Sequence, residues 1–291
     1  MSQPNNMPVL AGQPVIKKTK GPPEPVRFAS FLGDNAFEFY RQVVAYLGQA
    51  TGLPTEMVCE LSADKQDQKV NAGQIQAVFT CGLPYVRKAD RQPPLLRLLA
   101  APVMDEARYQ NRPIYFSDII VRADSPYRSL ADLRGATFTY NEVYSLSGYM
   151  LPCYHLFTRG EIGSFFKETV QSGSHAASMD WVEAGHAATA AIDSVVLAME
   201  MAQRPERASG LRVVERVGPM PMPPVAASTQ LAHPLHHQLQ QALLTMHTTG
   251  RGQAVLKQGG LRRFASVTDS DYDPIRRVIQ VLDNAGVTEL R

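Results

Sequence analysis

The sequence lacks any long hydrophobic run: no apolar stretch approaches the roughly 18 residues that a membrane-spanning helix needs. It has only three cysteines, Cys59, Cys81 and Cys153, which are far apart and odd in number. That pattern suits neither a disulfide framework nor a zinc site, and we expect three buried thiols that pack as small hydrophobic groups. The motif Gly-x-x-x-x-Gly-Lys-[Ser/Thr] is also missing, so any ATPase that works with this protein is another chain.

The chain also lacks an excess of charge of either sign. It has 29 Lys and Arg against 27 Asp and Glu, a formal net charge of +2, and no basic stretch interleaved with aromatics. Nucleic acid is therefore not an expected partner. The hydrophobic fraction of 44% and the charged fraction of 19% are normal for a soluble globular protein, and 291 residues suffice for one large domain or two smaller ones.

Residues 1–26 differ in composition from the rest of the chain. They are rich in Pro, Gln, Asn and Gly, and contain Lys17, Lys18 and Lys20. We expect a disordered N-terminal arm, because such a composition cannot bury enough apolar surface to fold. The segment has no apolar core of signal-peptide length, so either the chain stays in the cytoplasm or an export signal is not part of this sequence.

From Arg27 onward, strand-like and helix-like stretches alternate. A strand-like run at 27–31 is followed by a helical face of Phe37, Tyr40, Val44 and Leu47. Repeated alternation of this kind predicts an α/β fold with mostly parallel sheets and helical crossovers. A proline-rich run, Pro219–Pro224, reads as a stiff crossing between two domains, since proline restricts the backbone.

The central stretch, 137–194, holds two Ser/Gly-rich loops that each open a helix, and a short apolar strand that ends in an acid. The loops are 139–148 and 172–175, and the strand is 189–193. The first backbone N–H groups of a helix have no intrahelical partners and lie at the positive end of its dipole. Two such helix starts with neighbouring hydroxyls would hold an oxyanion such as phosphate, phosphonate or carboxylate.

The same residues allow blander or different interpretations. Serine before a helix is an ordinary N-cap that usually binds nothing. Ser145, His175 and Asp193 could be arranged as a Ser-His-Asp catalytic set. The sequence lacks the Gly-x-Ser-x-Gly elbow that exposes a nucleophile, because Val143 stands where the first glycine belongs. We therefore expect binding without catalysis.

Histidines and tyrosines outside these loops have simple structural interpretations. His233, His236 and His237 open a late helix and are more typical of a solvated surface than of a metal site, so no metal is predicted. Tyr40 and Tyr115 fit the packing of a core. No cofactor is expected.

Six stretches, taken in their order and spacing, carry a family resemblance: Cys81–Val86, Ser117–Ser125, Ser129–Gly135, Ser145–Tyr149, Ser172–His175 and Ala191–Ser194. Together they resemble the periplasmic phosphate- and phosphonate-binding proteins of ABC importers, which have the type II periplasmic-binding-protein fold. The resemblance covers about Arg27 to Arg291. It implies two α/β lobes with mostly parallel sheets, and a ligand cleft between lobes that close by hinge motion.

In this sequence the resemblance places lobe 1 at residues 27–117 plus 224–291 and lobe 2 at residues 118–223. It implies a solute-binding protein, not an enzyme, that holds a small anionic or zwitterionic ligand for an ABC transporter permease. A periplasmic monomer is the corresponding expectation. The alternative, favoured by the missing signal peptide, is a cytoplasmic ligand sensor or accessory protein on the same fold.

The resemblance also assigns a ligand site by position. Ser145, Ser147 and the backbone ahead of Gly148 resemble the loop that receives the phosphonate oxygens, and His175 resembles the second-loop histidine that touches the anion. Asp193 resembles the acid near the far end of the ligand. The full set of predicted ligand-binding residues is Tyr85, Tyr140, Glu142, Tyr144, Ser145, Ser147, Gly148, Ser174, His175 and Asp193.

Three residues depart from the family pattern. Gln76 stands where an aspartate is usual in the strand before Cys81. Leu146 replaces the middle hydroxyl of the usual Ser-Thr-Ser-Gly loop and removes one donor. Glu142 lies just upstream, and a carboxylate beside an anion opposes it unless it pairs with a cation. A zwitterionic ligand carrying both an anion and an amine would satisfy Glu142 and Asp193 as well as the serines.

Overall fold

The computed structural model describes residues 24–59, 62–161, 163, 165–287 and 290. Most of the predicted N-terminal arm, residues 1–23, lies outside the described residues. The first strand begins at Val26, inside the predicted arm. No helix in the described ranges is both long enough and apolar enough to cross a membrane.

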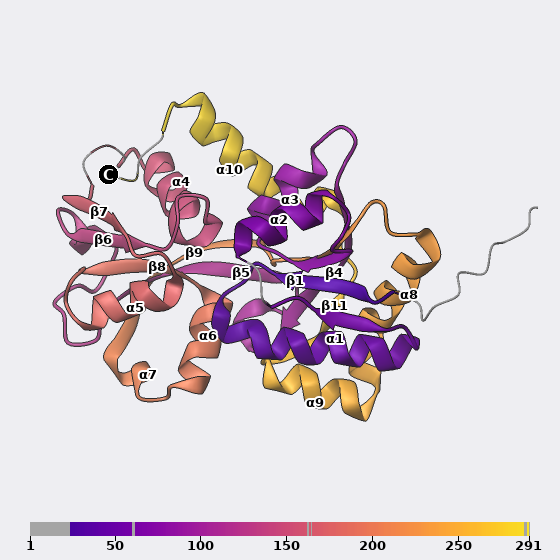
Figure 1. Cartoon of the computed structure of the whole chain (residues 1–291). Coiled ribbons are helices and arrows are strands. Elements are labelled where there is room, and N and C mark those ends of the chain that lie inside the picture. The colour runs from indigo at the N-terminus through magenta and orange to yellow at the C-terminus, as the bar shows by residue number, and fades with distance from the viewer. Residues whose placement is uncertain (1–23, 60–61, 162, 164, 288–289, 291) are drawn as a thin grey trace, which may run out of the picture.

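Two separate β-sheets organise the chain (Figure 1). The first has the order β11-β4-β10-β3-β1-β2 and the second the order β7-β6-β8-β5-β9. The strands of the first sheet are β1 (Val26–Ser30), β2 (Thr55–Met57), β3 (Ala77–Phe79), β4 (Leu96–Met104), β10 (Val225–Ser228) and β11 (Leu261–Ala265). Those of the second are β5 (Ile114–Arg122), β6 (Thr137–Tyr140), β7 (Glu168–Gln171), β8 (Thr189–Asp193) and β9 (Leu211–Pro221).

Both sheets are mixed, which corrects the expectation of mostly parallel sheets. β1 pairs in parallel with β2 and β3, as β6 does with β7 and β8. β10 is antiparallel to β3 and β4, β11 to β4, and β5 to β8 and β9. The cause is the route of the chain: β4 ends and β10 begins where the chain passes between the sheets, so the two strands run in opposite directions. The same holds for β5 and β9.

Helices cover both sheets (Figure 1). Their bounds are α1 (Phe37–Thr51), α2 (Ala63–Asn71), α3 (Gly82–Ala89), α4 (Leu151–Thr158), α5 (His175–Glu183), α6 (Ser194–Gln203), α7 (Arg207–Gly210), α8 (His233–Leu244), α9 (Gly250–Gln258) and α10 (Asp273–Asn284). Helix α1 shows why they form. Tyr40, Val44 and Leu47 fall on one buried face at helical spacing, and Gly52, with φ of 70°, ends the helix in the left-handed region.

Short turns of other helical types link these elements: the 3₁₀ turns η1 (Asp34–Ala36), η2 (Ala107–Tyr109), η3 (Ala131–Leu133), η5 (Met246–Thr248) and η6 (Asp269–Tyr272), and the π turn η4 (Leu146–Met150). The turn η4 overlaps the end of the predicted loop 139–148 and the first residues after it. The helix that follows, α4, begins directly after this turn, at Leu151.

Two segments, 105–113 and 222–224, carry the chain between the sheets. We use lobe 1 for residues 24–104 and 225–272, and lobe 2 for residues 114–221. The predicted boundary at residue 117 falls inside β5, which pairs in the second sheet from Ile114 onward. The two crossing segments are joined by a hydrogen bond of 2.9 Å from Met222 N to Pro113 O.

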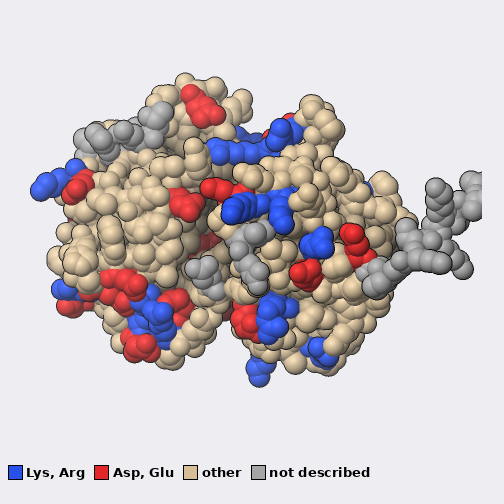
Figure 2. Space-filling view, in the orientation of Figure 1, with Lys and Arg blue, Asp and Glu red and all other residues tan. Residues whose placement is uncertain are grey.

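Helix α10 forms a further link between the lobes. It packs against α3 of lobe 1 and against α4 and β9 of lobe 2. Beyond it, Leu290 is fully buried and its N–H donates to the hydroxyl of Tyr149 at 3.0 Å. Figure 2 shows the hollow between the two halves of the molecule, with basic and acidic side chains interspersed on the face in view.

Candidate functional site

The first Ser/Gly-rich loop forms a capped turn that contains a tightly packed glycine. Ser145 is the N-cap of η4, and its Oγ accepts a hydrogen bond from Gly148 N at 3.0 Å. A Cβ at position 148 would collide with Oδ1 of Asn141. A side chain at position 148 would therefore require the Asn141 amide to move. The Ser145 cap and the close approach of Asn141 define the shape of this turn.

Ser147 and His175 meet between the two predicted loops. Ser147 is buried, and its Oγ lies 3.4 Å from Nε2 of His175. Its carbonyl accepts a hydrogen bond of 2.6 Å from the hydroxyl of Ser117 in β5. His175 is the first residue of α5, which Ser174 caps by accepting a hydrogen bond from Ala177 N at 3.0 Å. The structure thus brings together the residues that the sequence predicted would form the anion site.

Burial lowers the pKa of His175 to about 4, because the charged imidazolium loses its hydration. The ring is therefore neutral near pH 7 and offers one N–H donor. Its Nδ1 is buried and has no hydrogen-bond partner within the described part of the chain. An unpaired buried polar atom is costly, so a ligand that paired with this ring would recover part of that cost.

Lobe 1 meets this loop at Cys81, which stands immediately before α3. The backbone N–H groups of Gly82, Leu83 and Leu146 all act on its thiol. Burial nevertheless raises the pKa of Cys81 to about 11. The start of α3 and the start of η4, from opposite lobes, therefore converge on one sulfur atom.

Asp193 lies near the group formed by Ser147, His175 and Cys81, at the end of β8. Its Oδ1 accepts hydrogen bonds from Val195 N at 2.8 Å and Val196 N at 3.3 Å, so it caps α6. Burial raises its pKa to about 7 despite these two bonds. Burial, and to a smaller extent the nearby Asp193, also raise the pKa of Cys81 and of Tyr115. Ser117, whose hydroxyl donates to Ser147 O, is the partner of Asp193 in the pairing of β5 with β8, so Asp193 lies close to the anion loop.

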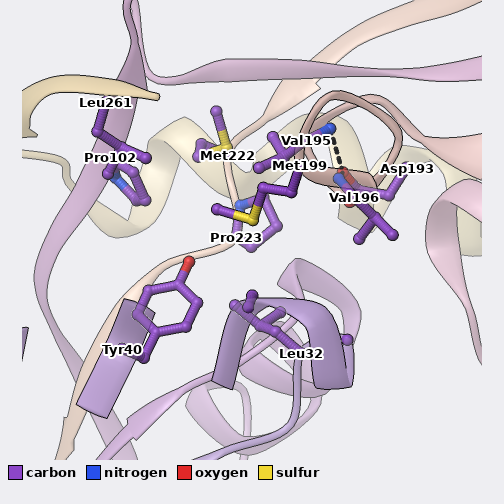
Figure 3. Close-up of a pocket in the computed structure, with 12 residues that line it drawn as sticks. Leu32, Tyr40, Pro102, Asp193, Val195, Val196, Met199, Met222, Pro223 and Leu261 are labelled. Atoms are coloured by element: carbon purple, nitrogen blue, oxygen red, sulfur yellow. Dashed lines mark hydrogen bonds between the residues drawn. The ribbon is translucent and has the colours of Figure 1, made fainter. Parts of the chain in front are cut away.

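A small cavity of about 30 Å³ adjoins Asp193 at the boundary between the lobes (Figure 3). Tyr40 lines it from lobe 1 and stacks on Phe79 with ring centroids 4.2 Å apart. Met199 lines it from α6, and Met222 lines it from the second crossing. The cavity has room for one or two water molecules, and residues of both lobes line it.

Asn35 of lobe 1 reinforces this closed arrangement. Its Nδ2 donates to Val196 O and to Oε2 of the buried Glu200, each at 3.3 Å. Its carbonyl accepts a bond of 2.9 Å from Nε2 of Gln203. One turn of lobe 1, η1, is thereby tied to three residues of α6 in lobe 2.

The remaining predicted residues lie at the edge of this cluster or outside it. Glu142 is exposed, so its carboxylate is hydrated. Tyr140 packs its ring on Tyr149 with centroids 4.5 Å apart. Tyr144 is 63% exposed. Tyr85 is buried in lobe 1, where its hydroxyl donates to Asp269 at 2.7 Å.

Sequence reasoning missed several residues of the site. Tyr40 was expected only to pack a core, and its place in the apolar stripe of α1 carries no signal that it also reaches the cavity. Ser117 and Asn141 support the anion loop through contacts that only the folded chain creates. Cys81 was expected to be an inert thiol. Its contact with the backbone N–H of Leu146 depends on how the two lobes come together.

A Ser-His-Asp relay is not formed among the described residues. The Oγ of Ser145 accepts from Gly148 N, and Asp193 caps its own helix. Nδ1 of His175, which an acid would have to orient, has no partner in the described ranges. No group of three or more His, Cys, Asp or Glu side chains among these residues is arranged to hold a metal ion.

Comparison with known proteins identifies the family. The family of ABC transporter phosphonate periplasmic substrate-binding proteins matches residues 28–272. The phosphonates-binding periplasmic protein of Escherichia coli (strain K12) is 27% identical over 180 residues, 60% of this chain and 53% of that protein. The aligned part of the chain thus spans about half the length of this curated relative.

Two solved structures share the fold. A binding protein component of an ABC phosphonate transporter from Pseudomonas aeruginosa superposes with a TM-score of 0.76 at 19% identity, covering 89% of this chain and 87% of that chain. PhnD1 from Prochlorococcus marinus (MIT 9301), in complex with methylphosphonate, has a TM-score of 0.76 at 18% identity, covering 89% of this chain and 98% of that chain.

These likenesses confirm the predicted two-lobe type II fold. The family match extends from the first strand to the turn before α10 and so takes in both lobes. The chain belongs to the family of periplasmic substrate-binding proteins of phosphonate ABC transporters.

Proposed function

We propose that this protein binds a phosphonate in the interlobe cleft and presents it to an ABC transporter permease. The observation that carries the proposal is the meeting of Ser147 and His175, 3.4 Å apart, where the turn η4 and the helix α5 begin. A hydroxyl and a neutral imidazole beside two helix starts are suitable donors for the oxygens of a phosphonate.

The residues around Ser147 fix the geometry and the charge of this anion site. Ser145 fixes the turn by accepting a hydrogen bond from Gly148 N, and Gly148 places no side chain against Asn141. His175 is held neutral by burial, so it can donate one hydrogen bond without adding a net charge. Nothing in this arrangement activates a nucleophile, and we propose binding without chemical change of the ligand.

Closure of the lobes completes the site in this proposal. Cys81 and Tyr40 belong to lobe 1, whereas Ser147, His175 and Asp193 belong to lobe 2, so both lobes contribute walls. A ligand that contacts both lobes stabilises the closed form by its differential affinity for that form. We propose that the protein acts as a monomer, that it works in the periplasm as the description of its family states, and that the permease recognises the closed form.

Isothermal titration calorimetry with methylphosphonate, phosphate and sulfate tests the proposal. We expect methylphosphonate to bind and Ser147→Ala to weaken that binding at least tenfold. The matched control is Ser209→Ala, which removes an exposed hydroxyl on α7 and leaves the affinity unchanged. Wild-type affinity in Ser147→Ala, or absence of binding to any phosphonate, would contradict the proposal.

Cell fractionation of the full-length protein tests the compartment separately. We expect the protein in the periplasmic fraction. Its retention in the cytoplasm would favour the alternative of a ligand sensor without a transporter.

A further inference from the structure

Asn35 of lobe 1 and helix α6 of lobe 2 meet across the boundary between the lobes. The Asn35 amide donates to Val196 O and to Oε2 of Glu200, each at 3.3 Å, and the Asn35 carbonyl accepts the bond of 2.9 Å from Gln203. Asn35 and Glu200 are 165 residues apart in the sequence, and the packing of η1 on α6 brings them together. Hinge motion that parts the lobes therefore breaks these bonds.

Glu200 is a buried acid with one oxygen committed inside lobe 2. Its side chain is 3% exposed, and its Oε1 forms ion pairs with Arg207 at 3.2 Å and with Arg204 at 3.3 Å. Arg207 is itself buried and also pairs with Asp180 and Glu183. A buried carboxylate needs partners for both oxygens, because losing water without replacement is costly. The second oxygen, Oε2, receives its partner from lobe 1.

That partner is a neutral amide and not a cation. Oδ1 of Asn35 is buried and has no hydrogen-bond partner in the described part of the chain. Closure thus pairs one atom of the amide and leaves the other unpaired, so the contact gains less than a fully satisfied amide would. When the lobes part, water hydrates both Asn35 and Glu200. Such a contact favours the closed form by a modest factor and still allows release.

We infer that Asn35 is a closure latch: by binding the buried carboxylate of Glu200 it sets the ratio of closed to open protein, and with it the affinity for every ligand, without touching the ligand. The inference goes beyond the proposed function, and only its affinity measurement rests on that function. Neither residue belongs to η4 or to α5, where the anion is proposed to bind. The affinity of a ligand that requires the closed form is proportional to the closed fraction.

The closed-to-open ratio of the ligand-free protein is the first measurement. Single-molecule fluorescence energy transfer measures it between labels on Ala254→Cys in α9 of lobe 1 and Lys167→Cys in lobe 2. A Cys59→Ser background removes the exposed native thiol. We expect Asn35→Ala to lower the ratio about fivefold, the equivalent of about 1 kcal/mol. Asn35→Asp should lower it at least tenfold, because it replaces the donor by a like charge that faces Glu200.

Asn71→Ala is the matched control. Nδ2 of Asn71 donates to the carboxylate of Asp67 at 3.0 Å, so this variant also removes an amide–carboxylate bond, but one that lies within lobe 1. We expect it to leave the closed-to-open ratio unchanged. A wild-type ratio in Asn35→Ala, or an equal fall in Asn71→Ala, would overturn the inference.

The affinities for methylphosphonate and ethylphosphonate are the second measurement. We expect Asn35→Ala to weaken both by one common factor, equal to the fall in the closed fraction. Unequal losses would identify Asn35 as a ligand contact and contradict the latch. If the wild type binds neither phosphonate, the proposed function fails, while the ratio measured without ligand still decides whether Asn35 is a latch.

Discussion

The guanidinium of Arg87 in lobe 1 lies over the ring of Tyr144 in lobe 2, with its central carbon 5.0 Å from the ring centroid. Tyr144 is otherwise 63% exposed, so this contact is its main tie to the rest of the molecule. The sequence predicts Tyr144 as a ligand residue. Its ring also makes this cation–π contact, which joins the lobes at the surface.

Tyr144→Ala should therefore weaken ligand binding about two- to fivefold, because an exposed cation–π contact is worth about 0.5–1 kcal/mol. The loss should fall on the dissociation rate, since the contact forms when the lobes are together. Stopped-flow dissociation of methylphosphonate measures it. Tyr144→Phe is the control because it keeps the ring, and an equal loss in that variant would argue against a cation–π role.

Ser145→Ala and Ser147→Ala should separate stability from binding. Ser145 caps η4, so its loss should cost about 1 kcal/mol of the free energy of unfolding. The Ser147 hydroxyl has a long contact of 3.4 Å with His175, so Ser147→Ala should leave the melting temperature of the empty protein nearly unchanged. Thermal denaturation without and with methylphosphonate measures both effects.

A large loss of stability in empty Ser147→Ala would identify that serine as a structural residue instead. Unchanged ligand binding in the same variant would lead to the same conclusion.

The free energy of unfolding of the wild type should fall as pH rises, and Asp193→Asn should abolish this fall. Burial raises the pKa of Asp193 to about 7 from an ordinary value of 3.8. Between these values the unfolded chain has released its proton and the folded chain retains it, so the free energy of unfolding falls as pH rises through this window. At about 1.4 kcal/mol per pKa unit the loss approaches about 4 kcal/mol.

Asparagine keeps the cap of α6 but does not ionise. Urea denaturation should therefore show that the free energy of unfolding of Asp193→Asn, relative to that of the wild type, is higher at pH 8 than at pH 5. An identical pH dependence in the two proteins would contradict the raised pKa.

The wild type should also lose stability as pH falls, and His175→Leu should abolish that loss. The folded pKa of about 4 lies below the ordinary 6.5, so the wild type loses stability as pH falls from 6.5 toward 4. The variant lacks that acid-side loss and also lacks the unpaired Nδ1. We expect it to be at least as stable as the wild type at pH 5 and to have lost the rise in melting temperature caused by methylphosphonate. Retained ligand stabilisation would remove His175 from the site.

Local signals in the sequence predicted much of the fold. The two Ser/Gly-rich loops do open helical turns, and β8 does end at Asp193, because N-caps and strand ends are encoded by neighbouring residues. The direction of the strands could not be read in this way. β10 enters its sheet from the crossing, and only the path of the whole chain makes it antiparallel.

The candidate site was predictable only on the lobe 2 side. Ser147 and His175 lie 28 residues apart in two recognisable loops. Tyr40 and Asn35 come from lobe 1, more than 150 residues from the α6 segment that they approach. Tyr85 bonds Asp269, 184 residues later, and no periodicity in the sequence could indicate that partner.

The hydrogen bond between Met222 N and Pro113 O has a practical consequence. Because the two crossing segments are bonded side by side, they define one axis, and rotation about it is the simplest relative motion open to the lobes. A single distance would then report the whole movement. A donor and acceptor fluorophore pair, one on each lobe, would serve as a ligand gauge without any knowledge of the individual contacts that the ligand makes.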